Sequence, residues 1–440
     1  MGSAATDPCV HCGFCLPTCA SYRVIGSEMD SPRGRIHALK AIEAGEQQLD
    51  AITASHFDSC LGCLACVTAC PSGVRYDELL EATRPKLNAP ELRTPAQRAF
   101  RRLLFALLPY PQRLKAVLRP LHNYAGSGLQ QWLRRSGLTA LLGPQLAALE
   151  GLLPPLPSER FNAPWPTVVK AHGERRARVG FVLGCVQTVF DPAVNTATVE
   201  VLSRNGVEVV IPPQQGCCGA VTHHQGEEAQ TRELAQALIN SFETVVGPGR
   251  PAGPEPLDAV LVAASGCGHT LKLYGQILPQ GGALAGQVRD VQEFLQELGL
   301  SETFSASLQP LHHPDGTPAT ADRPLVVTVH DACHMLHGQG IAAQPRQLLQ
   351  RIPHLQLKEP LEAGLCCGSA GIYNLVQPEE AQVLGRLKAD DLAATAATVI
   401  ASANIGCSLQ LRRHLQEAQH PQTVAHPMQL LALSAATAHG

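Results

Sequence analysis

The sequence reads Cys9-Val-His-Cys12-Gly-Phe-Cys15-Leu-Pro-Thr-Cys19 near one end, and the same cysteine spacing returns as Cys60-Leu-Gly-Cys63-Leu-Ala-Cys66-Val-Thr-Ala-Cys70. In the spacing C-x2-C-x2-C-x3-C, the first three thiolates can hold three corners of an iron–sulfur cube from one tight loop. The fourth cysteine is expected to begin a helix and to point toward the other cluster. The two runs therefore predict two [4Fe–4S] clusters, the first held by Cys9, Cys12, Cys15 and Cys70 and the second by Cys60, Cys63, Cys66 and Cys19.

Zinc is the alternative occupant of these runs, because C-x2-C pairs also suit zinc. Zinc sites of that kind pair two such knuckles and seldom use a third cysteine at the same spacing, so the repeated third cysteine favours iron–sulfur clusters. Ala20 stands where Pro usually follows the fourth cysteine, whereas Pro71 keeps that residue. Since this Pro shapes the chain without binding the cluster, the departure leaves the prediction unchanged.

The other eight of the 16 cysteines form a pattern that occurs twice, which indicates a duplicated unit. Each copy has a single cysteine, a Cys-Cys-Gly turn and a further single cysteine, and we expect each copy to form a four-thiolate pocket. Metal or cluster ligation is favoured over thiol redox chemistry and over a purely structural role. The first pocket consists of Cys185, Cys217, Cys218 and Cys267, and the second of Cys333, Cys366, Cys367 and Cys407.

Short apolar runs end just before the single cysteines of both copies and alternate with helix-like stretches. Such alternation predicts βα units on a parallel sheet, whose ligands gather at the carboxyl ends of the strands. The expected strands span 179–184, 258–264, 325–329 and 398–402, and the expected helices include 231–243 and 379–394.

The predicted fold class is α+β and multidomain. We expect an all-helical ferredoxin-like module with two clusters over 1–91 and a basic helical connector over 92–173. Two α/β Cys-Cys-Gly halves follow over 174–305 and 306–440. Because the pattern is duplicated, we expect the halves to be related by pseudo-twofold symmetry.

The connector has no Asp or Glu between 92 and 149 but nine basic residues, which alternate with apolar clusters such as 103–108. A basic amphipathic segment of this kind can lie on an anionic membrane surface or bind a partner. The alternative is that its apolar faces pack on the neighbouring domains and its Arg side chains stay in solvent. The basic residues are Arg93, Arg98, Arg101, Arg102, Arg113, Lys115, Arg119, Arg134 and Arg135.

Four polar residues are candidates for tuning the clusters. Arg33 and Arg35, at the start of an expected helix, can neutralise thiolate-ligated clusters, face an acidic partner, or simply be solvated. His330 and Asp331 precede a predicted ligand at a strand end, where the histidine can hydrogen-bond to cluster sulfur or deliver protons. The alternative is that Asp331 caps the following helix and the histidine is an ordinary polar neighbour.

Net charge and the lack of certain sequence motifs limit which partners, cofactors and cellular compartment we expect. Lys and Arg number 34 against 37 Asp and Glu, and the net charge of −3 gives no reason to expect nucleic acid as a partner. No secretory signal is visible, and no apolar run reaches the roughly 18–20 residues of a membrane span. We therefore expect a cytoplasmic protein, at most peripheral on the inner membrane.

No G-x-G-x-x-G follows an expected strand, so we expect neither flavin nor nicotinamide in this chain.

Two ferredoxin-like runs followed by duplicated Cys-Cys-Gly units resemble the iron–sulfur subunits of flavin-linked hydroxyacid and glycerol-3-phosphate dehydrogenases. Cys9-Val-His-Cys-Gly-Phe-Cys15, Ser31-Pro-Arg-Gly-Arg-Ile36 and Ala403-Asn-Ile-Gly-Cys407 are most similar to the family of glycolate oxidase iron–sulfur subunits. The resemblance implies a subunit, inactive alone, that passes electrons from a partner flavoprotein oxidising glycolate to glyoxylate toward a quinone or other acceptor. The rival functions are electron transfer for lactate or glycerol-3-phosphate oxidation, and a thiol–disulfide enzyme similar to the heterodisulfide reductases, which share the duplicated unit.

The full unit of those reductases closes with C-x2-C and supplies a fifth thiolate for a noncubane cluster. Here Ala264 and Asn404 stand three residues before Cys267 and Cys407, so each pocket keeps four cysteines. An ordinary cubane, zinc or a vacant site fits this pattern. We expect one or two further clusters, or zinc, in these pockets, and favour a third [4Fe–4S] cluster in the second half.

Overall fold

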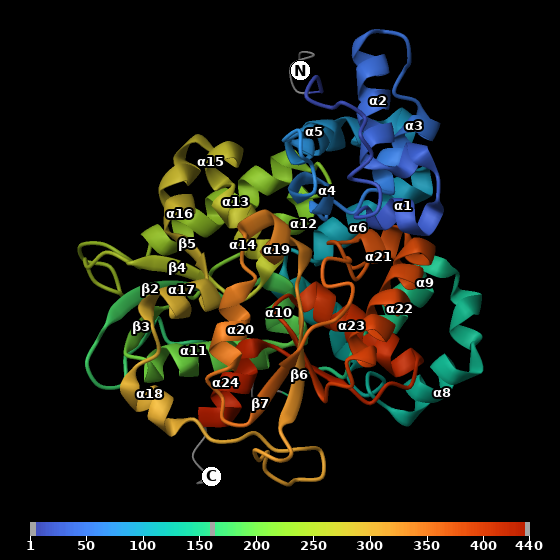
Figure 1. The fold of residues 1–440 in the computed structure, drawn as a ribbon. Helices are drawn as coiled ribbons and strands as arrows, with labels where there is room; N and C mark the ends of the chain where they lie inside the picture. Colours follow the sequence, from blue (N-terminus) through green and yellow to red (C-terminus); the bar gives the residue numbers. More distant parts are fainter. Residues whose placement is uncertain (1–5, 159–162, 436–440) are drawn as a thin grey trace.

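Short helices joined by long loops make up the N-terminal part of this computed structural model, which describes residues 6–158 and 163–435 (Figure 1). Ser31 starts the longest of these helices: Pro32 occupies the first turn, and the Ser31 hydroxyl accepts a hydrogen bond from the Gly34 amide at 3.0 Å. The elements are α1 (Ala20–Ile25), η2 (Glu28–Asp30), α2 (Pro32–Glu43), α3 (Ala51–Asp58), α4 (Ala65–Thr68), α5 (Tyr76–Thr83), η3 (Arg84–Asn88) and η4 (Pro90–Leu92), where η marks a 3₁₀ helix.

The two fourth cysteines of the ferredoxin-like runs differ in their local structure. Cys19 directly precedes α1, as the spacing predicts. Cys70 instead follows the one-turn helix α4, and the Gly73 amide donates back to the Cys70 carbonyl at 3.3 Å in a turn where Gly73 has φ 67°. The prediction of a helix beginning at the fourth cysteine is therefore wrong for Cys70, because the helical turn forms earlier, around Cys66, and the turn at Gly73 redirects the chain.

The connector is helical, and its buried side chains pack on both halves of the molecule. Leu104 of α6 packs in one cluster with Ile372 of the second half, and Leu114 of α7 packs with Val189 of the first half. The buried faces of α6 and α7 therefore pack on the neighbouring domains, as the alternative prediction for the connector states. The connector elements are α6 (Pro95–Leu107), α7 (Pro111–Leu118), η5 (Arg119–Leu121), α8 (Gly128–Ser136), η6 (Leu138–Leu142) and α9 (Pro144–Gly151).

The first half is built on a sheet with strand order β1-β3-β2-β4-β5, in which only β1 is antiparallel to its neighbour. β1 lies inside the range predicted for the connector, yet it pairs with β3, so the first sheet begins earlier than the predicted boundary. The strands are β1 (Val168–Val169), β2 (Ala177–Val182), β3 (Val207–Val210), β4 (Ala259–Val262) and β5 (Val288–Asp290). The helices are α10 (Cys185–Phe190), α11 (Pro192–Arg204), α12 (Ala220–His223), α13 (Glu228–Glu243), α14 (Ser265–Lys272), α15 (Tyr274–Ile277), η8 (Pro279–Gly281), α16 (Gly282–Gln287), α17 (Val291–Leu298) and α18 (Glu302–Ser307).

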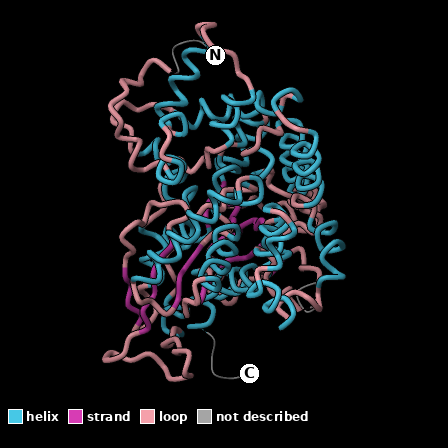
Figure 2. The backbone as a smooth tube through the Cα atoms, turned by 90° about the vertical axis from the view of Figure 1, so that its right-hand side faces the viewer, coloured by secondary structure: helices cyan, strands magenta, loops and turns pink. Residues whose placement is uncertain are grey.

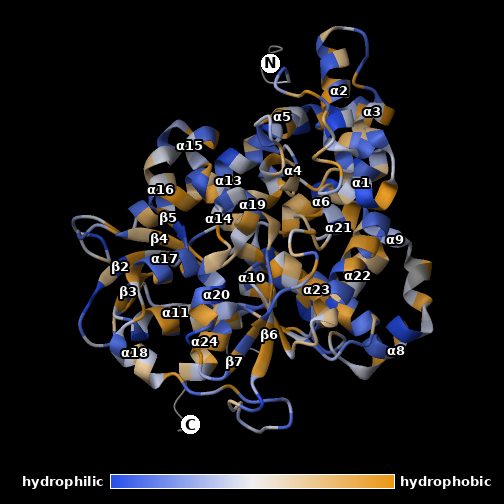
Figure 3. Ribbon diagram, in the orientation of Figure 1, coloured by the Kyte–Doolittle hydropathy of each residue, from blue (hydrophilic) through white to orange (hydrophobic). Residues whose placement is uncertain are grey.

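The second half repeats this topology with an all-parallel sheet of order β7-β6-β8-β9, which corresponds to β3-β2-β4-β5. The predicted central strands are confirmed as β2, β4, β6 and β8, and β6 stands out as hydrophobic in Figure 3. The strands are β6 (Leu325–His330), β7 (Leu355–Lys358), β8 (Val399–Ser402) and β9 (Thr423–Ala425). The helices are α19 (Cys333–Gln339), α20 (Ala343–Leu349), α21 (Tyr373–Val376), α22 (Pro378–Ala394), α23 (Ile405–Glu417) and α24 (Pro427–Ala435).

The two halves share a hydrophobic core. Helix α11 packs on α24 and α17 packs on α20, and the core joins side chains such as Leu202, Leu295, Leu349 and Leu431 from both halves. The strands gather in the part of the molecule away from the N-terminal module (Figure 2). The contacts are reciprocal, as a duplicated unit leads one to expect, and the twofold relation itself stays a prediction.

Gly226 marks a close approach between the first half and the N-terminal module. Its φ is 73°, and a Cβ there would lie 2.5 Å from the carbonyl carbon of Arg84 and 2.6 Å from the nitrogen of Pro85. The neighbouring Gln225 carbonyl accepts a hydrogen bond from the Asn88 side chain at 2.9 Å. The docking of η3 on this loop therefore requires a residue without a side chain.

We expect Gly226→Ala to destabilise the protein by about 1–3 kcal/mol, because the methyl group would overlap backbone atoms that cannot move freely. The readout is the thermal unfolding midpoint of the full chain. Gly249→Ala is the matched control, since Gly249 has a similar φ of 71° and no described atom within 4 Å of an added Cβ. Equal losses in the two variants would contradict the close approach.

Candidate metal centres

The cysteines of the first predicted cluster come together close to the molecular surface. Cys9, Cys12, Cys15 and Cys70 line one small cavity, to which Cys66 also contributes, and Cys12 is exposed. The loop that carries the first three has left-handed backbone at His11 (φ 54°) and Gly13 (φ 85°). These turns let thiols that are close in sequence face the same point, as a cluster requires.

The second predicted set lies deeper in the molecule. The thiols of Cys63 and Cys66 both lie within electrostatic reach of Cys60 and Cys19. Burial, followed by the neighbouring cysteines, raises the pKa of Cys63 and Cys66 well above the usual value of a thiol. Thiols in such a place become thiolates only when a cation compensates their charge, so this donor set fits a metal cluster.

Arg35 supplies a buried positive charge next to the second set. Its Nε donates to the His56 carbonyl at 2.5 Å, and its Nη2 donates to the hydroxyls of Ser21 at 3.0 Å and Ser59 at 2.8 Å. Burial opposes the charge, but Cys60, Tyr76, Cys19 and Asp30 together raise the pKa of Arg35 above its usual value. Its Nη1 has no hydrogen-bond partner among the described residues, which leaves one donor free for cluster sulfur.

Arg33, two residues earlier, has a different environment. Its side chain is partly exposed, pairs with Glu28 at 2.6 Å and donates to the His11 carbonyl at 3.1 Å. Because it pairs with a carboxylate in partial contact with solvent, it exerts less of its charge on the clusters than Arg35 does. Arg35 and Arg33 thus differ in burial: Arg35 is buried, whereas Arg33 is partly exposed.

In the first half, the four predicted thiols are in mutual contact. The Sγ atoms of Cys185 and Cys217 are 3.2 Å apart, and the thiol of Cys218 interacts with those of Cys217 and Cys267. The lining around them is otherwise largely apolar, with Val182 at the end of β2 and Ala264 just before α14. Tyr274 supports the Cys-Cys-Gly turn by donating its hydroxyl to the Cys218 carbonyl at 2.8 Å.

In the second half, the four predicted thiols form a similar row with more polar surroundings. Cys366 interacts with Cys333 and Cys367, and Cys367 interacts with Cys407. The amide nitrogen of Asn404 donates to Cys407 Sγ at 3.2 Å. The turn needs Gly368, which has φ 83°, because a Cβ there would lie 2.8 Å from the Ala381 carbonyl oxygen of α22.

The two Cys-Cys-Gly sites open into one cavity, although the sequence predicts a separate pocket in each half. A cavity of about 140 Å³ between the halves is lined by all eight of these cysteines. They meet because each set lies at the carboxyl ends of its sheet and the two ends face each other. Cys63 of the N-terminal module also lines this cavity, so the second ferredoxin-like site lies at its edge.

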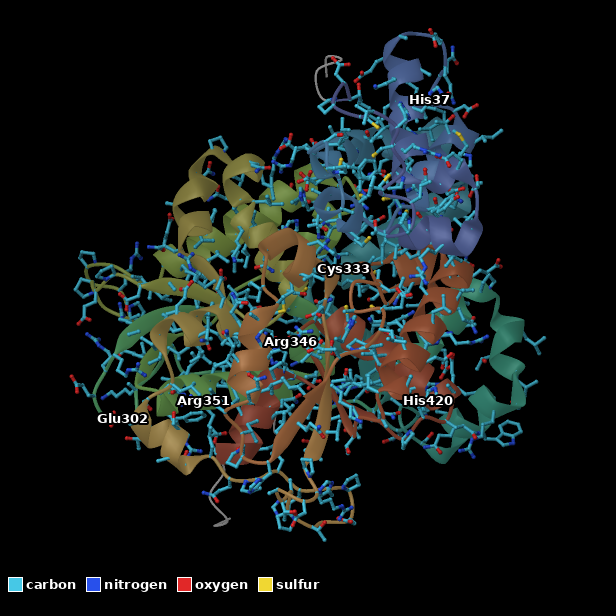
Figure 4. The ribbon with its side chains drawn as sticks, in the orientation of Figure 1. His37, Glu302, Cys333, Arg346, Arg351 and His420 are labelled. Carbon is cyan, nitrogen blue, oxygen red and sulfur yellow. The ribbon has the colours of Figure 1, made fainter. Side chains whose placement is uncertain are left out.

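Helix α19 connects the N-terminal module with the second half. It begins with Cys333, and its next histidine, His334, bonds through Nε2 to the Gly62 carbonyl at 2.9 Å. One turn later, His337 Nδ1 bonds to the Thr68 hydroxyl at 2.8 Å. In Figure 4 the sulfur atoms extend from the N-terminal module to the middle of the molecule around Cys333.

His330 lies behind the thiols of the second half. It is the last residue of β6 and is 2% exposed, and one of its ring nitrogens lies within 4.8 Å of the thiols of Cys367 and Cys407. Burial, followed by the charge of Lys388, lowers the pKa of His330 to about 3, so the ring is neutral.

Asp331 takes part in an ion-pair network and does not cap the following helix. It forms a bidentate ion pair with Arg346, with oxygen–nitrogen distances of 2.8 and 2.7 Å, and Arg346 also binds Glu359. Helix α19 begins after Ala332, so the interpretation of Asp331 as its cap is wrong. The carboxylate is held by an arginine of α20 because that helix returns along the strand end; Figure 4 labels Cys333 and Arg346 in this region.

Sequence reasoning missed two buried cations and His269. Arg84 is 7% exposed and donates to the Cys60 carbonyl at 3.3 Å, and no sequence signal marks it. Lys388 is fully buried and donates to the Glu362 carbonyl at 2.6 Å; its place in the apolar stripe of α22 was a usable signal. Around the cavity edge, the rings of His224, His269 and His334 lie within 4.6–6.4 Å of one another.

Comparison with known families agrees with this order of sites. The chain matches the family described as "4Fe-4S dicluster domain" over residues 5–74. It matches "Glycolate oxidase iron-sulfur subunit, linker region" over 96–153. It matches "Cysteine-rich domain" twice, over 179–272 and 327–412.

Individual relatives are similar over most of the chain. A "Probable glycolate oxidase iron-sulfur subunit" of Bacillus subtilis is 36% identical over 92% of this chain and 88% of its own length. The "Glycolate oxidase iron-sulfur subunit" of Escherichia coli is 34% identical over 92% of this chain and 89% of its own. A "Lactate utilization protein A" of an Exiguobacterium species is 25% identical over 58% of this chain and 96% of its own.

We expect Arg35→Gln to lower the reduction potential of the second ferredoxin-like centre by roughly 100 mV. At an effective dielectric of about 20, a unit charge a few ångströms away is worth about 2–3 kcal/mol, and about 1.4 kcal/mol corresponds to about 59 mV for one electron. The measurement is a redox titration followed by electron paramagnetic resonance. Arg33→Gln is the matched control on the same helix, and Arg35→Lys should retain most of the potential; equal shifts in the Arg35→Gln and Arg33→Gln variants would refute the role of burial.

Proposed function

Because the chain belongs to the family of glycolate oxidase iron–sulfur subunits, we propose that it is the electron-transfer subunit of a glycolate dehydrogenase complex. It receives electrons from a partner flavoprotein that oxidises glycolate to glyoxylate and passes them toward a quinone or other acceptor. The observation that carries this proposal is the continuous order of thiol sites from an exposed loop to the central cavity.

Residues shared between neighbouring sites support an arrangement of these sites in series. Exposed Cys12 brings the first site to the surface, where a partner can approach it. Cys66 lines the first site and lies near the thiols of the second, and Cys63 of the second lies near Cys333. The [4Fe–4S] clusters bound by these cysteines supply one-electron transfer. We propose two clusters in the N-terminal module and a third in the second half.

The flavin is assigned to the partner for a chemical reason. Oxidation of a hydroxyacid removes two electrons and needs a hydride acceptor or an equivalent electron sink, which is cofactor chemistry. Cysteine-ligated clusters accept one electron at a time. The chain thus transfers electrons, and its partner oxidises the hydroxyacid.

One observation supports a second candidate function. Because both Cys-Cys-Gly motifs line one cavity, a substrate disulfide could meet thiols of both halves there. Catalysis of disulfide reduction by the isolated chain with a reduced dye would favour this thiol–disulfide enzyme. The electron carrier is preferred because each pocket lacks the fifth cysteine, with Ala264 and Asn404 in its place.

We further propose that the connector lies on an anionic membrane surface. Leu129, Trp132 and Leu141 of α8 and η6 are 59%, 58% and 83% exposed, and they lie in the acid-free basic segment. Helix α8 is at the margin of the molecule in Figure 1, away from both sheets. Arg101 cannot take part, because it is buried and donates to the Gln225 side chain at 2.8 Å. Among the described residues, no helix has the length and apolar character needed to cross a bilayer.

We expect the isolated chain, with its clusters loaded anaerobically, to show no glycolate turnover with a quinone analogue or a dye as acceptor. Adding the flavoprotein should produce turnover, and should bleach the visible absorbance of the clusters when glycolate is present without an acceptor. Appreciable glycolate oxidation by the chain alone would overturn the proposed function.

We expect the triple variant Leu129→Ser, Trp132→Ser, Leu141→Ser to bind anionic vesicles at least about tenfold more weakly, because each buried apolar side chain contributes about 1.5–3 kcal/mol. Co-sedimentation with phosphatidylglycerol vesicles measures this binding. Leu361→Ser is the control, since Leu361 is 95% exposed outside the connector. Unchanged binding of the triple variant would count against the membrane contact.

A further inference from the structure

The two Cys-Cys-Gly sites have equivalent thiols but different surroundings. His330 ends β6 three residues before Cys333, and the corresponding residue before Cys185 is Val182, which ends β2. The two residues occupy matching register positions, with Val182 opposite Val262 and His330 opposite Ser402. The duplication therefore presents an imidazole to one site and an isopropyl group to the other.

The surroundings of His330 are also more polar than their counterparts. Lys388 of α22 lies in the corresponding place to Ile239 of α13, and Asn404 corresponds to Ala264. Lys388 is fully buried, and Asn404 donates to Cys407 Sγ. Lys388 has its own partners in the Glu362 and Ala363 carbonyls and in Asp391, so the polar side chain beside these thiols that is unpartnered among the described residues is His330.

His330 itself lacks a partner in the protein. Neither Nδ1 nor Nε2 makes a hydrogen bond to any of the residues that the structure describes, although the ring is buried. The hydroxyl of Ser402, its neighbour on β8, is likewise unpartnered within the described chain. A buried imidazole with two unmade hydrogen bonds is unfavourable by about 1–3 kcal/mol for each group, which calls for a ligand.

Geometry indicates what that ligand is. A ring nitrogen of His330 and the thiols of Cys367 and Cys407 lie within 4.8 Å of one another. An imidazole nitrogen and two thiolates within this limit can converge on one metal centre by small side-chain movements, because metal–nitrogen and metal–sulfur bonds about 2.0–2.3 Å long hold neighbouring ligands somewhat closer together. A neutral imidazole is the form that ligates metals.

We propose that His330 is a nitrogen ligand of the metal centre held by Cys333, Cys366, Cys367 and Cys407, which makes the second site a five-donor Cys/His centre. The first site, with Val182 in the equivalent position, takes four thiolates only. The absent fifth thiolate at Asn404 is thus replaced by a donor from the neighbouring strand β6. This inference rests on the proposed occupancy of the second site, which the metal content of the chain tests separately.

The experiment uses the full chain, purified anaerobically and grown with ¹⁵N-labelled histidine. Iron and zinc per chain are measured first. If the second site holds iron, pulsed electron paramagnetic resonance of the reduced protein should show strong coupling to a histidine nitrogen, which the cysteine-only centres cannot give. If it holds zinc, which almost always binds four donors, zinc X-ray absorption should show one nitrogen neighbour beside three sulfur atoms.

Two variants locate the ligand. His330→Val, which copies the first half, should abolish the nitrogen signal, while the signals of the N-terminal module remain. His330→Cys should keep the metal and lose the nitrogen signal, because it offers a thiolate from the same position. His334→Gln is the control, since this neighbour of Cys333 bonds to the Gly62 carbonyl and should leave the nitrogen coupling in place.

The outcomes separate the two proposals. Iron for the two N-terminal clusters alone, without zinc, would overturn the occupancy of the second site and this inference with it. An occupied second site with only a weak nitrogen coupling, or with a coupling that survives in His330→Val, would overturn the ligation by His330 and leave the proposed electron-transfer function standing.

Discussion

Four thiolates in mutual contact and out of water repel one another, and burial disfavours each negative charge, so such a group is stable only where positive charge compensates it. The chain contains three largely buried thiol groups of this kind and a fourth nearer the surface, where Cys12 is exposed, and much of its architecture follows from this requirement. Left-handed backbone at Gly62 and Leu64 lets the thiols of one loop converge, and Arg35 places a guanidinium beside Cys60 and Cys19. A metal bound at such a group supplies the remaining positive charge, and its binding is thereby coupled to the stability of the fold.

The thiol groups also lie where the two sheets and the N-terminal module meet. Each sheet presents its cysteines at the carboxyl ends of its strands, and the halves pack so that these ends face one cavity. Helix α19 then carries two functions: its first residue is Cys333, and its histidines bind the loop that holds Cys63. Helix α19 therefore links the second ferredoxin-like site with the Cys-Cys-Gly site of the second half.

Duplication supplied two equivalent thiol sets, and substitution around them made the sites different. Val182 and Ile239 keep the first site apolar, whereas His330 and Lys388 give the second a nitrogen donor and a positive charge. A buried imidazole without a partner is unfavourable, so His330 in the second half indicates different occupants or different potentials for the two sites. Of the two Cys-Cys-Gly sites, the polar one contacts the N-terminal module, because Cys63 lies near Cys333 and Cys366.

Local sequence determined the elements and the thiol groups of this protein. The C-x2-C loops bring their own cysteines together, and the β-branched runs before Cys185, Cys267, Cys333 and Cys407 form strands wherever they pack, because both properties depend on neighbours in sequence. Only the tertiary structure decided which distant groups meet: that both Cys-Cys-Gly sets share one cavity, that Asp331 pairs with Arg346, and that Arg35, rather than Arg33, is the buried cation. These outcomes depend on the packing of sheets and helices that are far apart in sequence, and on which side chains that packing removes from water. No residue spacing along the chain specifies them.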